Sequence, residues 1–364
     1  MRLSEGILPP YWFGEVKPRS KVDPFFGWIG RHVNGPGNRT KRMTEVFGNH
    51  YVNPNLVYAQ SAWSIAQLND IIPRAIRRNV PVVLNQNGWY YPAWYAGDWK
   101  SANAQLVEVH RQSRCVIFQS RFCIEAMSAL TGVMPDAPVV LHNAVPLPTT
   151  ELIERNPTRP TLWLSGAFHK DADHVLLPAL EAVDILRREW KADLPLLKLA
   201  GYFDEAAKQS EWFGTVQKKL NDLSSHGVCV WIGKYAPAEL PDLMKDVSLA
   251  LHLQSKDSCP NAVLERMALG VGHVYADSGG TPELVGETGI AVTSPLDWSR
   301  QTPVAVDELV DAIKRGMEQW HNLGRQSFER VKSQFSWNNY IASHERIFRS
   351  CEGVLTVDVA TLSG

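Results

Sequence analysis

The sequence contains no apolar run that approaches the roughly 20 residues needed for a membrane-spanning helix. Its N-terminus, MRLSEGILPPYW, also lacks the long apolar core of a secretory signal peptide. Glycine and proline number 25 and 23 among 364 residues, which is near average and excludes collagen-like or disordered low-complexity chains. These absences predict a globular, cytoplasmic protein, and the length suffices for two domains of ordinary size.

Cysteine is also scarce. Five cysteines, at positions 115, 123, 229, 259 and 351, form an odd number without a close pair. This pattern excludes a disulfide framework and a CxxC metal site. We expect the five thiols to be reduced and mostly buried.

The chain has almost no net charge, with 37 Lys and Arg against 38 Asp and Glu, but the charge is unevenly distributed. Residues 1–150 carry +6 and the remainder −7. The basic excess lies mainly in Lys17, Arg19, Lys21, Arg31, Arg39, Lys41 and Arg42. These residues are too sparse for a nucleic-acid groove. Two interpretations remain, a solvated face and a surface that touches anionic lipid or a phosphorylated ligand.

Short apolar runs alternate with stretches of helical periodicity, which is typical of βαβ units and predicts an α/β fold with parallel sheets. The expected strands are Pro81–Leu84, Cys115–Phe118, Pro138–Leu141, Thr161–Leu164, Leu196–Ala200, Val228–Ile232 and Val247–Leu251. The expected helices are Ile65–Arg78, Ala102–Arg111, Val175–Trp190 and Leu240–Lys245. Val145–Pro160, with four prolines, is expected to link two domains. Two such sheets facing one another would place a ligand in the cleft between them.

The segment Leu251–Ala291 has the most informative pattern. A polar loop, Gln254–Pro260, precedes a stretch of helical spacing that begins at Asn261, and Asp257 and Glu265 stand eight positions apart. The N–H groups from Cys259 to Val263 could cradle a diphosphate, with the two carboxylates accepting hydrogen bonds from hydroxyls on either side. By itself, the spacing favours a capping aspartate and a surface glutamate over a ligand-binding pair.

At these residues the chain resembles the retaining glycosyltransferases of family 4, the glycosyl transferases group 1. The motifs CPNAVLERMALG and SGGTPELVGETG are similar to the donor-site segment of that family, with Asp257 in place of its first glutamate. IFQSRFC, VVLHNAVP and FSWNNYIASHERIF resemble its strand-Ser motif, its hinge and its closing helix. The resemblance implies the GT-B fold of two facing Rossmann-like domains, with an acceptor-side domain at 1–145, a donor domain at 146–334, and a returning helix and tail at 335–364.

The resemblance also implies the residue roles. Asp257 would hold the transferred sugar and Glu265 the ribose, as the catalytic pair. The other implied donor-binding residues are Lys170, Tyr235, Gly37, Ser258, Cys259, Pro260, Asn261, Ala262 and Val263. The implied donor is a nucleoside-diphosphate-sugar, and no metal or other cofactor is implied. Asn87, Trp89 and Arg39 are the candidates on the acceptor side.

Several of these residues have plainer interpretations. Lys170 is the only fixed cation in LSGAFHKDADH, where the family has an arginine and a lysine, and it would otherwise be an exposed loop residue. Gly37, in GPGN, is expected in a glycine loop near the donor phosphate or in a surface turn. The aromatic cluster from Trp89 to Trp99 fits core packing as well as an acceptor or membrane-proximal wall.

The sequence therefore predicts a retaining, metal-independent glycosyltransferase acting on a glycan, a lipid-linked saccharide or a similar acceptor. Asn85, Gln86 and Asn87 cannot serve as a general base. The alternative is a catalytically degenerate GT-B scaffold that acts as a nucleotide- or sugar-binding protein or as a regulatory protein. A cytoplasmic protein is expected, with peripheral contact at the inner membrane face left open. The nucleobase, the sugar, the acceptor and the oligomeric state are left open as well.

Overall fold

The computed structural model describes residues 22–27, 35–149, 151–152, 155, 157, 159–190 and 195–351. The basic residues Lys17, Arg19, Lys21 and Arg31 and the expected tail at 352–364 lie outside these ranges. The chain divides into two compact units. The first contains Met1–Tyr90, Gly97–His142 and Asn338–Gly364, and the second contains Tyr91–Ala96 and Asn143–Trp337. The short segment Tyr91–Ala96 therefore groups with the second unit although both its flanks belong to the first.

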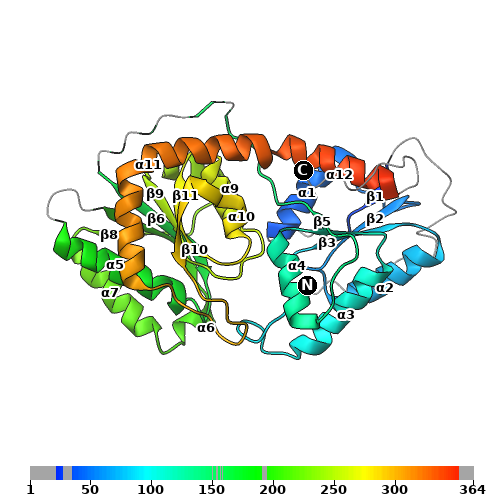
Figure 1. Ribbon diagram of the computed structural model, residues 1–364, viewed down its shortest axis with the longest axis horizontal. Coiled ribbons are helices and arrows are strands. Elements are labelled where there is room, and N and C mark those ends of the chain that lie inside the picture. The colour runs from blue at the N-terminus through cyan, green and yellow to red at the C-terminus, as the bar shows by residue number, and fades with distance from the viewer. Residues whose placement is uncertain are drawn as a thin grey trace. The chain divides into compact units, whose positions relative to one another are not determined.

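The first unit is built on a parallel sheet with its strands in chain order (Figure 1). The strands are β1 (Pro24–Phe25), β2 (Leu56–Gln60), β3 (Val82–Gln86), β4 (Cys115–Phe118) and β5 (Val139–Val140). The helices are α1 (Gly35–Phe47), α2 (Ile65–Arg77), α3 (Trp99–Gln112), α4 (Arg121–Thr131) and α12 (Trp337–Cys351). β2, β3 and the second half of β4 are buried, which explains their nearly continuous apolar sequences.

Side-chain caps begin three of these helices, α2, α3 and α4. Ser64 Oγ accepts a hydrogen bond from Gln67 N at 3.2 Å, and Gln67 Oε1 accepts one from Ser64 N at 3.1 Å, so a capping box starts α2. Ser120 Oγ accepts from Cys123 N at 3.2 Å at the start of α4. Helix α4 ends at Gly132, which has a φ of 71°. The strand-Ser motif of the sequence is thus a strand followed by a capped helix.

Helix α12 completes the core of the first unit. The Phe348 ring lies 5.3 Å from that of Phe47 and 5.7 Å from that of Tyr58. The Tyr58 hydroxyl also lies 3.2 Å from His344 Nε2. These aromatic contacts join the end of the described chain to strand β2 and helix α1.

The second unit contains a six-stranded parallel sheet in the order β11-β10-β9-β6-β7-β8. Its strands are β6 (Thr161–Phe168), β7 (Leu196–Phe203), β8 (Cys229–Gly233), β9 (Leu249–His252), β10 (Gly272–Asp277) and β11 (Gly289–Thr293). From β6 outward the chain winds to one side as far as β8 and then to the other as far as β11. This is the Rossmann order, in which the direction of winding switches between β6 and β9.

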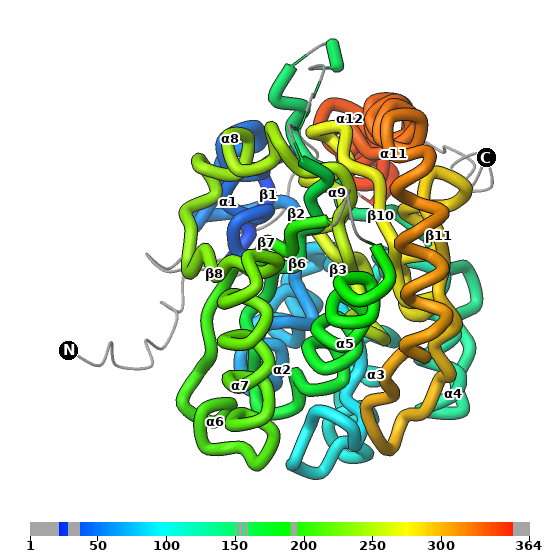
Figure 2. The backbone as a smooth tube through the Cα atoms, turned by 90° about the vertical axis from the view of Figure 1, so that its left-hand side faces the viewer, coloured from blue at the N-terminus to red at the C-terminus, as the bar shows by residue number. Residues whose placement is uncertain are grey.

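Helices cover both faces of this sheet (Figures 1 and 2). The helices of the second unit are α5 (Asp173–Glu189), α6 (Glu205–Lys208), α7 (Phe213–Ser225), α8 (Leu240–Met244), α9 (Asn261–Met267), α10 (Thr281–Val285) and α11 (Val306–Gln334), with short 3-10 turns at Pro237–Glu239 and Gly286–Thr288. Leu162, Leu164 and Leu251 face a core shared with α5, α7 and α11. Trp163 and Ala250 face α8 on the other side. Helix α11 bends at Gln319, whose backbone is not helical.

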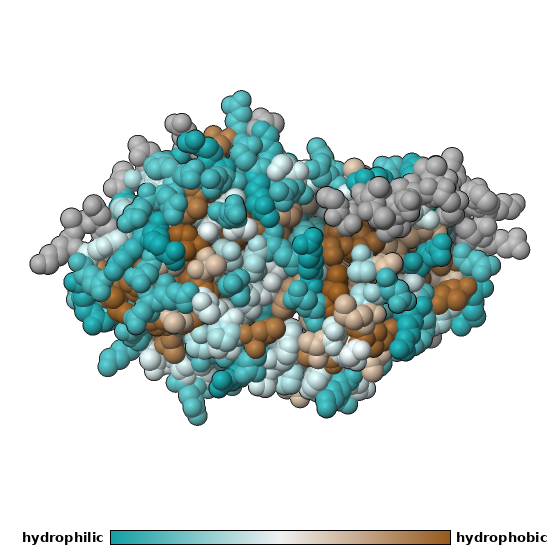
Figure 3. All heavy atoms as spheres, viewed as in Figure 1, coloured by the Kyte–Doolittle hydropathy of each residue, from teal (hydrophilic) through white to brown (hydrophobic). Residues whose placement is uncertain are grey.

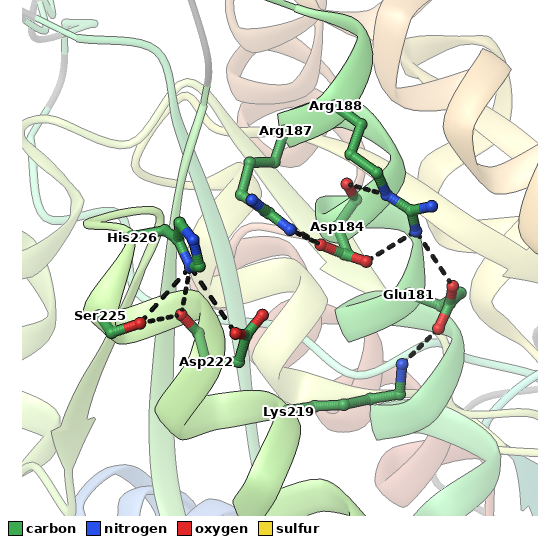
Figure 4. Close-up of polar contacts among 8 residues, drawn as sticks. All are labelled: Glu181, Asp184, Arg187, Arg188, Lys219, Asp222, Ser225 and His226. Carbon is green, nitrogen blue, oxygen red and sulfur yellow. Dashed lines mark hydrogen bonds and ion pairs between the residues drawn. The ribbon is translucent and has the colours of Figure 1, made fainter.

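An ion-pair network ties α5 to α7 on the outer surface (Figure 4). Lys219 on α7 pairs with Glu181 on α5. Arg187 and Arg188 both contact Asp184 at 2.7 Å within α5. Because these groups are partly exposed, each pair stabilises the fold only modestly.

The predicted elements are found, with shifts at their ends. Cys115–Phe118 is β4 as expected, whereas Thr161–Leu164 is only the first half of β6. The prediction of a glycine loop at Gly35–Asn38 is wrong, because this stretch forms the first turn of helix α1. Proline is compatible with a first helical turn, since its fixed φ suits the helix and its missing N–H has no partner there anyway.

All five cysteines are free thiols, and three of them are buried. None of the helices in the described ranges combines the length and apolar character needed to cross a bilayer. The face seen in Figure 3 carries hydrophilic residues interspersed with smaller hydrophobic areas, as is usual for globular proteins.

Candidate active site

The candidate site lies where the winding direction switches in the second sheet, a position at which open α/β sheets bind their ligands. Loop 169–172 follows β6, and loop 253–260 follows β9. The first loop carries Lys170 and the second carries Asp257. Topology therefore brings together two of the residues predicted from the sequence.

The backbone of Asp257 is held by the Ser-Gly-Gly turn that follows β10. Gly280 N donates to Asp257 O at 2.7 Å, and Lys256 N donates to Ser278 Oγ at 3.2 Å. Gly279 has a φ of +72°, and a Cβ added there would lie 2.3 Å from Asp257 O. The close contact requires glycine, so this turn fixes where Asp257 can place its carboxylate.

We expect Gly279→Ala to lower the free energy of unfolding by about 2–4 kcal/mol, because the new methyl group combines an unfavourable φ with a backbone clash. Urea unfolding measures the change. Gly214→Ala in α7 is the matched control, since a Cβ there meets nothing within 4 Å. The control should be neutral or stabilising by up to about 1 kcal/mol. Equal effects of the two substitutions would contradict the role of Gly279.

The Asp257 carboxylate is partly exposed, and only one of its two oxygens accepts a hydrogen bond from the described residues. Its Oδ1 accepts a hydrogen bond from Cys259 N at 3.1 Å. Its Oδ2 makes no hydrogen bond to any other described residue. Burial raises the pKa of this carboxyl to about 6, and the bond from Cys259 opposes the shift only in part. Asp257 thus keeps one oxygen available as a hydrogen-bond acceptor. Its ionised form lowers the free energy of unfolding, because the pKa is raised in the folded state.

Helix α9 follows this loop and carries Glu265 on its exposed side. No side chain caps the helix. Within the described ranges, the N–H groups of Ser258, Asn261 and Ala262 make no hydrogen bond. The N–H of Cys259 donates to Asp257 and that of Val263 donates to Pro260 O. The cradle expected from Cys259 to Val263 therefore excludes those two N–H groups, because both already have acceptors.

Lys256 places a cation beside Asp257. The side chain is 4% exposed, and its Nζ donates to Arg300 O at 3.1 Å. Nζ also lies 5.9 Å from the centre of the Tyr91 ring. Burial lowers the pKa of this ammonium group, and the charges of Asp297 and Asp171 oppose the shift. An ammonium group in this position favours a nearby anion.

A second cation, Arg266, belongs to the last turn of α9 and is 2% exposed. Its NH1 donates to Ser165 Oγ at 3.0 Å, and its Nε to His273 Nε2 at 3.3 Å. Burial lowers the pKa of Arg266, while the charge of Glu265 raises it. Burial and the Arg266 charge lower the pKa of His252 to about 3, so this histidine is neutral. Among the described residues, no carboxylate is hydrogen-bonded to Arg266, and its charge makes this side of the sheet electropositive.

The remaining predicted donor residues lie near this region. Lys170 is exposed, and its carbonyl accepts a hydrogen bond from Trp212 Nε1 at 2.7 Å. Its ammonium group makes no ion pair with the described residues. Tyr235 is half-buried, with the centre of its ring 5.7 Å from that of Trp163.

Cys259 and Pro260 are buried and serve the fold. Asn143 N donates to Cys259 Sγ at 3.3 Å, and Asn143 Nδ2 donates to Cys259 O at 2.8 Å. Asn143 comes from the VVLHNAVP segment, which the sequence identified as a hinge. These two bonds fix the start of α9, and the side chains of Cys259 and Pro260 are directed into the fold rather than to a ligand.

In the first unit, polar residues gather at the carboxyl ends of β3 and β4. Gln119 Nε2 donates to Asn85 Oδ1 at 2.8 Å. With its amide oxygen turned toward Arg39, Asn87 accepts from Arg39 NH2 at 2.9 Å and from Gln119 Nε2 at 2.5 Å. Arg39 is 5% exposed and comes from α1. The structure thus brings together Arg39 and Asn87, two of the three residues predicted on the acceptor side.

Trp89 is a core residue, which corrects its predicted acceptor-side position. It is 4% exposed, its Nε1 donates to Cys123 O at 2.9 Å, and its ring lies 5.2 Å from that of His110. Gly37 lies in the first turn of α1 and not in the predicted loop, while its donor-binding role stays a prediction. The aromatic density of the segment gave no indication of which rings are buried.

Sequence reasoning missed Lys256 and Tyr91. Lys256 stands next to Asp257, but a lysine in a polar loop gives no signal of burial. Tyr91 belongs to the aromatic cluster after β3, and only the fold brings it to the loop after β9.

Comparison with known proteins defines the class. Residues 159–316 match the family model described as glycosyl transferases group 1, so the second unit carries a domain of that family. No curated protein sequence matches the chain. HepE from Anabaena, crystallised with UDP, is similar in structure with a TM-score of 0.65 and 16% identity, over 82% of this chain and 79% of that one. Sucrose-phosphate synthase from Thermosynechococcus elongatus gives a TM-score of 0.62 and 15% identity, over 88% and 78%.

A glycosyltransferase from Rickettsia africae is also similar, with a TM-score of 0.63 and 13% identity, over 86% of this chain and 80% of that one. These neighbours share two Rossmann-like parallel sheets with this chain, which is the GT-B fold of glycosyltransferases. The predicted fold class is confirmed. Residues 159–316 therefore match a glycosyl transferases group 1 domain, within a chain that has the GT-B fold.

Proposed function

We propose that the chain transfers a sugar from a nucleoside-diphosphate-sugar to a glycan, a lipid-linked saccharide or a similar acceptor, with retention and without a metal ion. The observation that carries the proposal is the Asp257 carboxylate, held at the switch point of the sheet with one oxygen that makes no hydrogen bond to the described residues. HepE, a structural neighbour, was crystallised with UDP and with UDP-glucose, which supports a donor of this kind.

In this proposal the donor diphosphate lies near the N–H groups of Ser258, Asn261 and Ala262, and Lys170 adds a cation. Donors already fixed in the folded protein stabilise the charge that develops on a leaving diphosphate. Asp257 accepts hydrogen bonds from hydroxyls of the transferred sugar. Glu265, exposed on α9, accepts them from the ribose, and Tyr235 lies toward the base.

We assign no side chain as general base. Asn85 and Gln86 end strand β3 and Asn87 follows it, and amides do not take up a proton. The leaving phosphate would therefore receive the proton of the acceptor hydroxyl, as retention permits. Arg39, Asn87 and Gln119 are the polar residues of the first unit that we propose for the acceptor. For a lipid-linked acceptor, the proposal includes peripheral membrane contact through the basic first half of the chain.

Thermal melting with uridine, guanosine, adenosine, cytidine and thymidine diphosphates tests the donor site. We expect one nucleotide to stabilise the protein, by about 2.7 kcal/mol at 100 times its Kd. The corresponding nucleoside, which lacks the diphosphate, is the control and should stabilise it far less. A chain that melts identically with all five diphosphates would contradict the proposed site.

Turnover of the sugar conjugates of the stabilising nucleotide then separates an active enzyme from a binding scaffold. A nucleotide that stabilises the protein while no conjugate is hydrolysed or transferred would favour the degenerate scaffold. The absence of an arginine in loop 169–172 is the observation behind that second candidate.

A further inference from the structure

The segment Tyr91–Ala96 belongs to the second unit although its neighbours in sequence do not. It is anchored to the loop between β11 and α11, where Ala93 N donates to Trp298 O at 3.0 Å. The Tyr91 ring lies 5.3 Å from that of Trp298 at an interplanar angle of 62°. The aromatic residues after β3 thus contribute to the candidate active site.

Tyr91 is held in place by further rings but keeps an available hydroxyl. Its ring lies 5.9 Å from that of Trp94, which is 45% exposed. Lys256 Nζ lies 5.9 Å from the centre of the Tyr91 ring. The Tyr91 hydroxyl makes no hydrogen bond within the described ranges. A half-buried tyrosine with an unpaired hydroxyl usually has a polar partner that comes from a ligand or water.

Two carboxylates lie near this hydroxyl. Burial raises the pKa of Tyr91, and the charges of Asp257 and Asp171 raise it further, so the hydroxyl remains a hydrogen-bond donor at all ordinary pH values. Asp171 Oδ2 accepts a hydrogen bond from Gln301 Nε2 at 3.1 Å. Asp257 Oδ2 has no partner among the described residues. The site therefore combines aromatic surface, a hydroxyl donor and a carboxylate acceptor.

We propose that Tyr91, together with Trp298 and Asp257, binds the pyranose ring of the donor sugar. A pyranose has apolar C–H faces that pack on aromatic rings and a rim of hydroxyls that both donate and accept. Tyr91 Oη donates to one hydroxyl of the sugar, and Asp257 Oδ2 accepts from another. This inference rests on the proposed function and assigns the sugar subsite within it.

Binding of the full chain to a nucleotide and to its sugar conjugate tests the assignment. The probes are UDP with UDP-glucose and GDP with GDP-mannose, and the pair that the wild-type protein binds is used. In Tyr91→Ala the ratio of the diphosphate Kd to the conjugate Kd should fall about tenfold, while the Kd of the diphosphate stays unchanged. Tyr91→Phe keeps the ring and should lower the ratio about threefold.

Tyr95→Ala is the matched control, because it removes a second tyrosine ring from the same segment, one that lies 5.6 Å from the ring of Trp94. It should leave both dissociation constants unchanged. An unchanged ratio in Tyr91→Ala, with diphosphate binding intact, would overturn the sugar subsite alone. A wild-type protein that binds none of the four probes, nor any diphosphate in the melting experiment, would overturn the proposed function and the subsite with it.

Discussion

Asp257→Asn is expected to stabilise the folded protein at pH 7 by about 1–2 kcal/mol while lowering sugar transfer on the order of a hundredfold. Burial raises the pKa of Asp257 to about 6, so the ionised carboxylate opposes folding at neutral pH. Partial exposure to water limits the size of this effect. Asparagine removes the charge, and its amide oxygen can still accept the hydrogen bond from Cys259 N. The charged acceptor for the sugar hydroxyl is lost.

The pH dependence follows from the direction of the shift. Because the pKa is raised in the folded state, the folded protein binds a proton between about pH 4 and 6 that the unfolded chain releases. The free energy of unfolding contributed by Asp257 therefore falls as pH rises through this window. The stabilising effect of Asp257→Asn should be complete above pH 6 and absent below pH 4. Transfer by the wild-type enzyme should decline as the pH falls below about 6, because the protonated carboxyl is a poorer acceptor.

Urea unfolding at pH 4 and pH 7 and an assay of sugar transfer measure these effects. Asp136→Asn is the control for the change in net charge, since Asp136 is exposed between α4 and β5. It should alter stability by less than about 0.5 kcal/mol. A less stable Asp257→Asn protein with full activity would show that Asp257 only shapes its own loop.

Glu265→Ala is expected to abolish detectable transfer without changing the melting temperature. Glu265 is exposed on α9, and alanine is a better helix former, so stability should change by less than about 0.5 kcal/mol. The proposed carboxylate contacts with the ribose hydroxyls contribute about 1.5–3 kcal/mol each. Losing two of them would reduce transfer on the order of a thousandfold.

The donor nucleotide distinguishes this variant from Asp257→Asn. Glu265→Ala should weaken the binding of the nucleoside diphosphate itself, whereas Asp257→Asn should leave it nearly unchanged. Calorimetric titration measures both affinities. Glu329→Ala, at an exposed position of α11, is the matched control and should bind and turn over normally. Full activity in Glu265→Ala would contradict the assignment of the nucleotide site.

Local patterns were sufficient for the fold and for part of the site. Strand β4 and helix α2 follow directly from apolar runs and a capping serine. Asp257 and Glu265 were predicted because both stand in one short segment that resembles the donor-site segment of a glycosyltransferase family, and their roles stay predictions. Strand β6 extends beyond its predicted end because Ser165 and Gly166 continue to pair with β7, although neither is a typical strand former.

Long-range contacts account for what the sequence did not reveal. The burial of Lys256 depends on loops that follow β10 and β11, and Tyr91 reaches the loop after β9 from a distant segment of the chain. Trp89 differs from its aromatic neighbours only in the direction of its side chain, which no periodicity specifies. The structural role of Cys259 could not be predicted from its own segment, because its hydrogen-bond partner, Asn143, stands more than a hundred positions earlier in the chain.

The chain passes between its two units at four points, after Tyr90, Ala96, His142 and Trp337. A fragment cut at residue 143, the natural choice for expressing the second unit by itself, would omit Tyr91–Ala96. Such a fragment retains Asp257, Glu265 and α9 but loses the aromatic segment anchored at Trp298. The two halves of this protein are consequently not interchangeable modules, and exchanging the second unit with that of a structural neighbour would have to carry these six residues along.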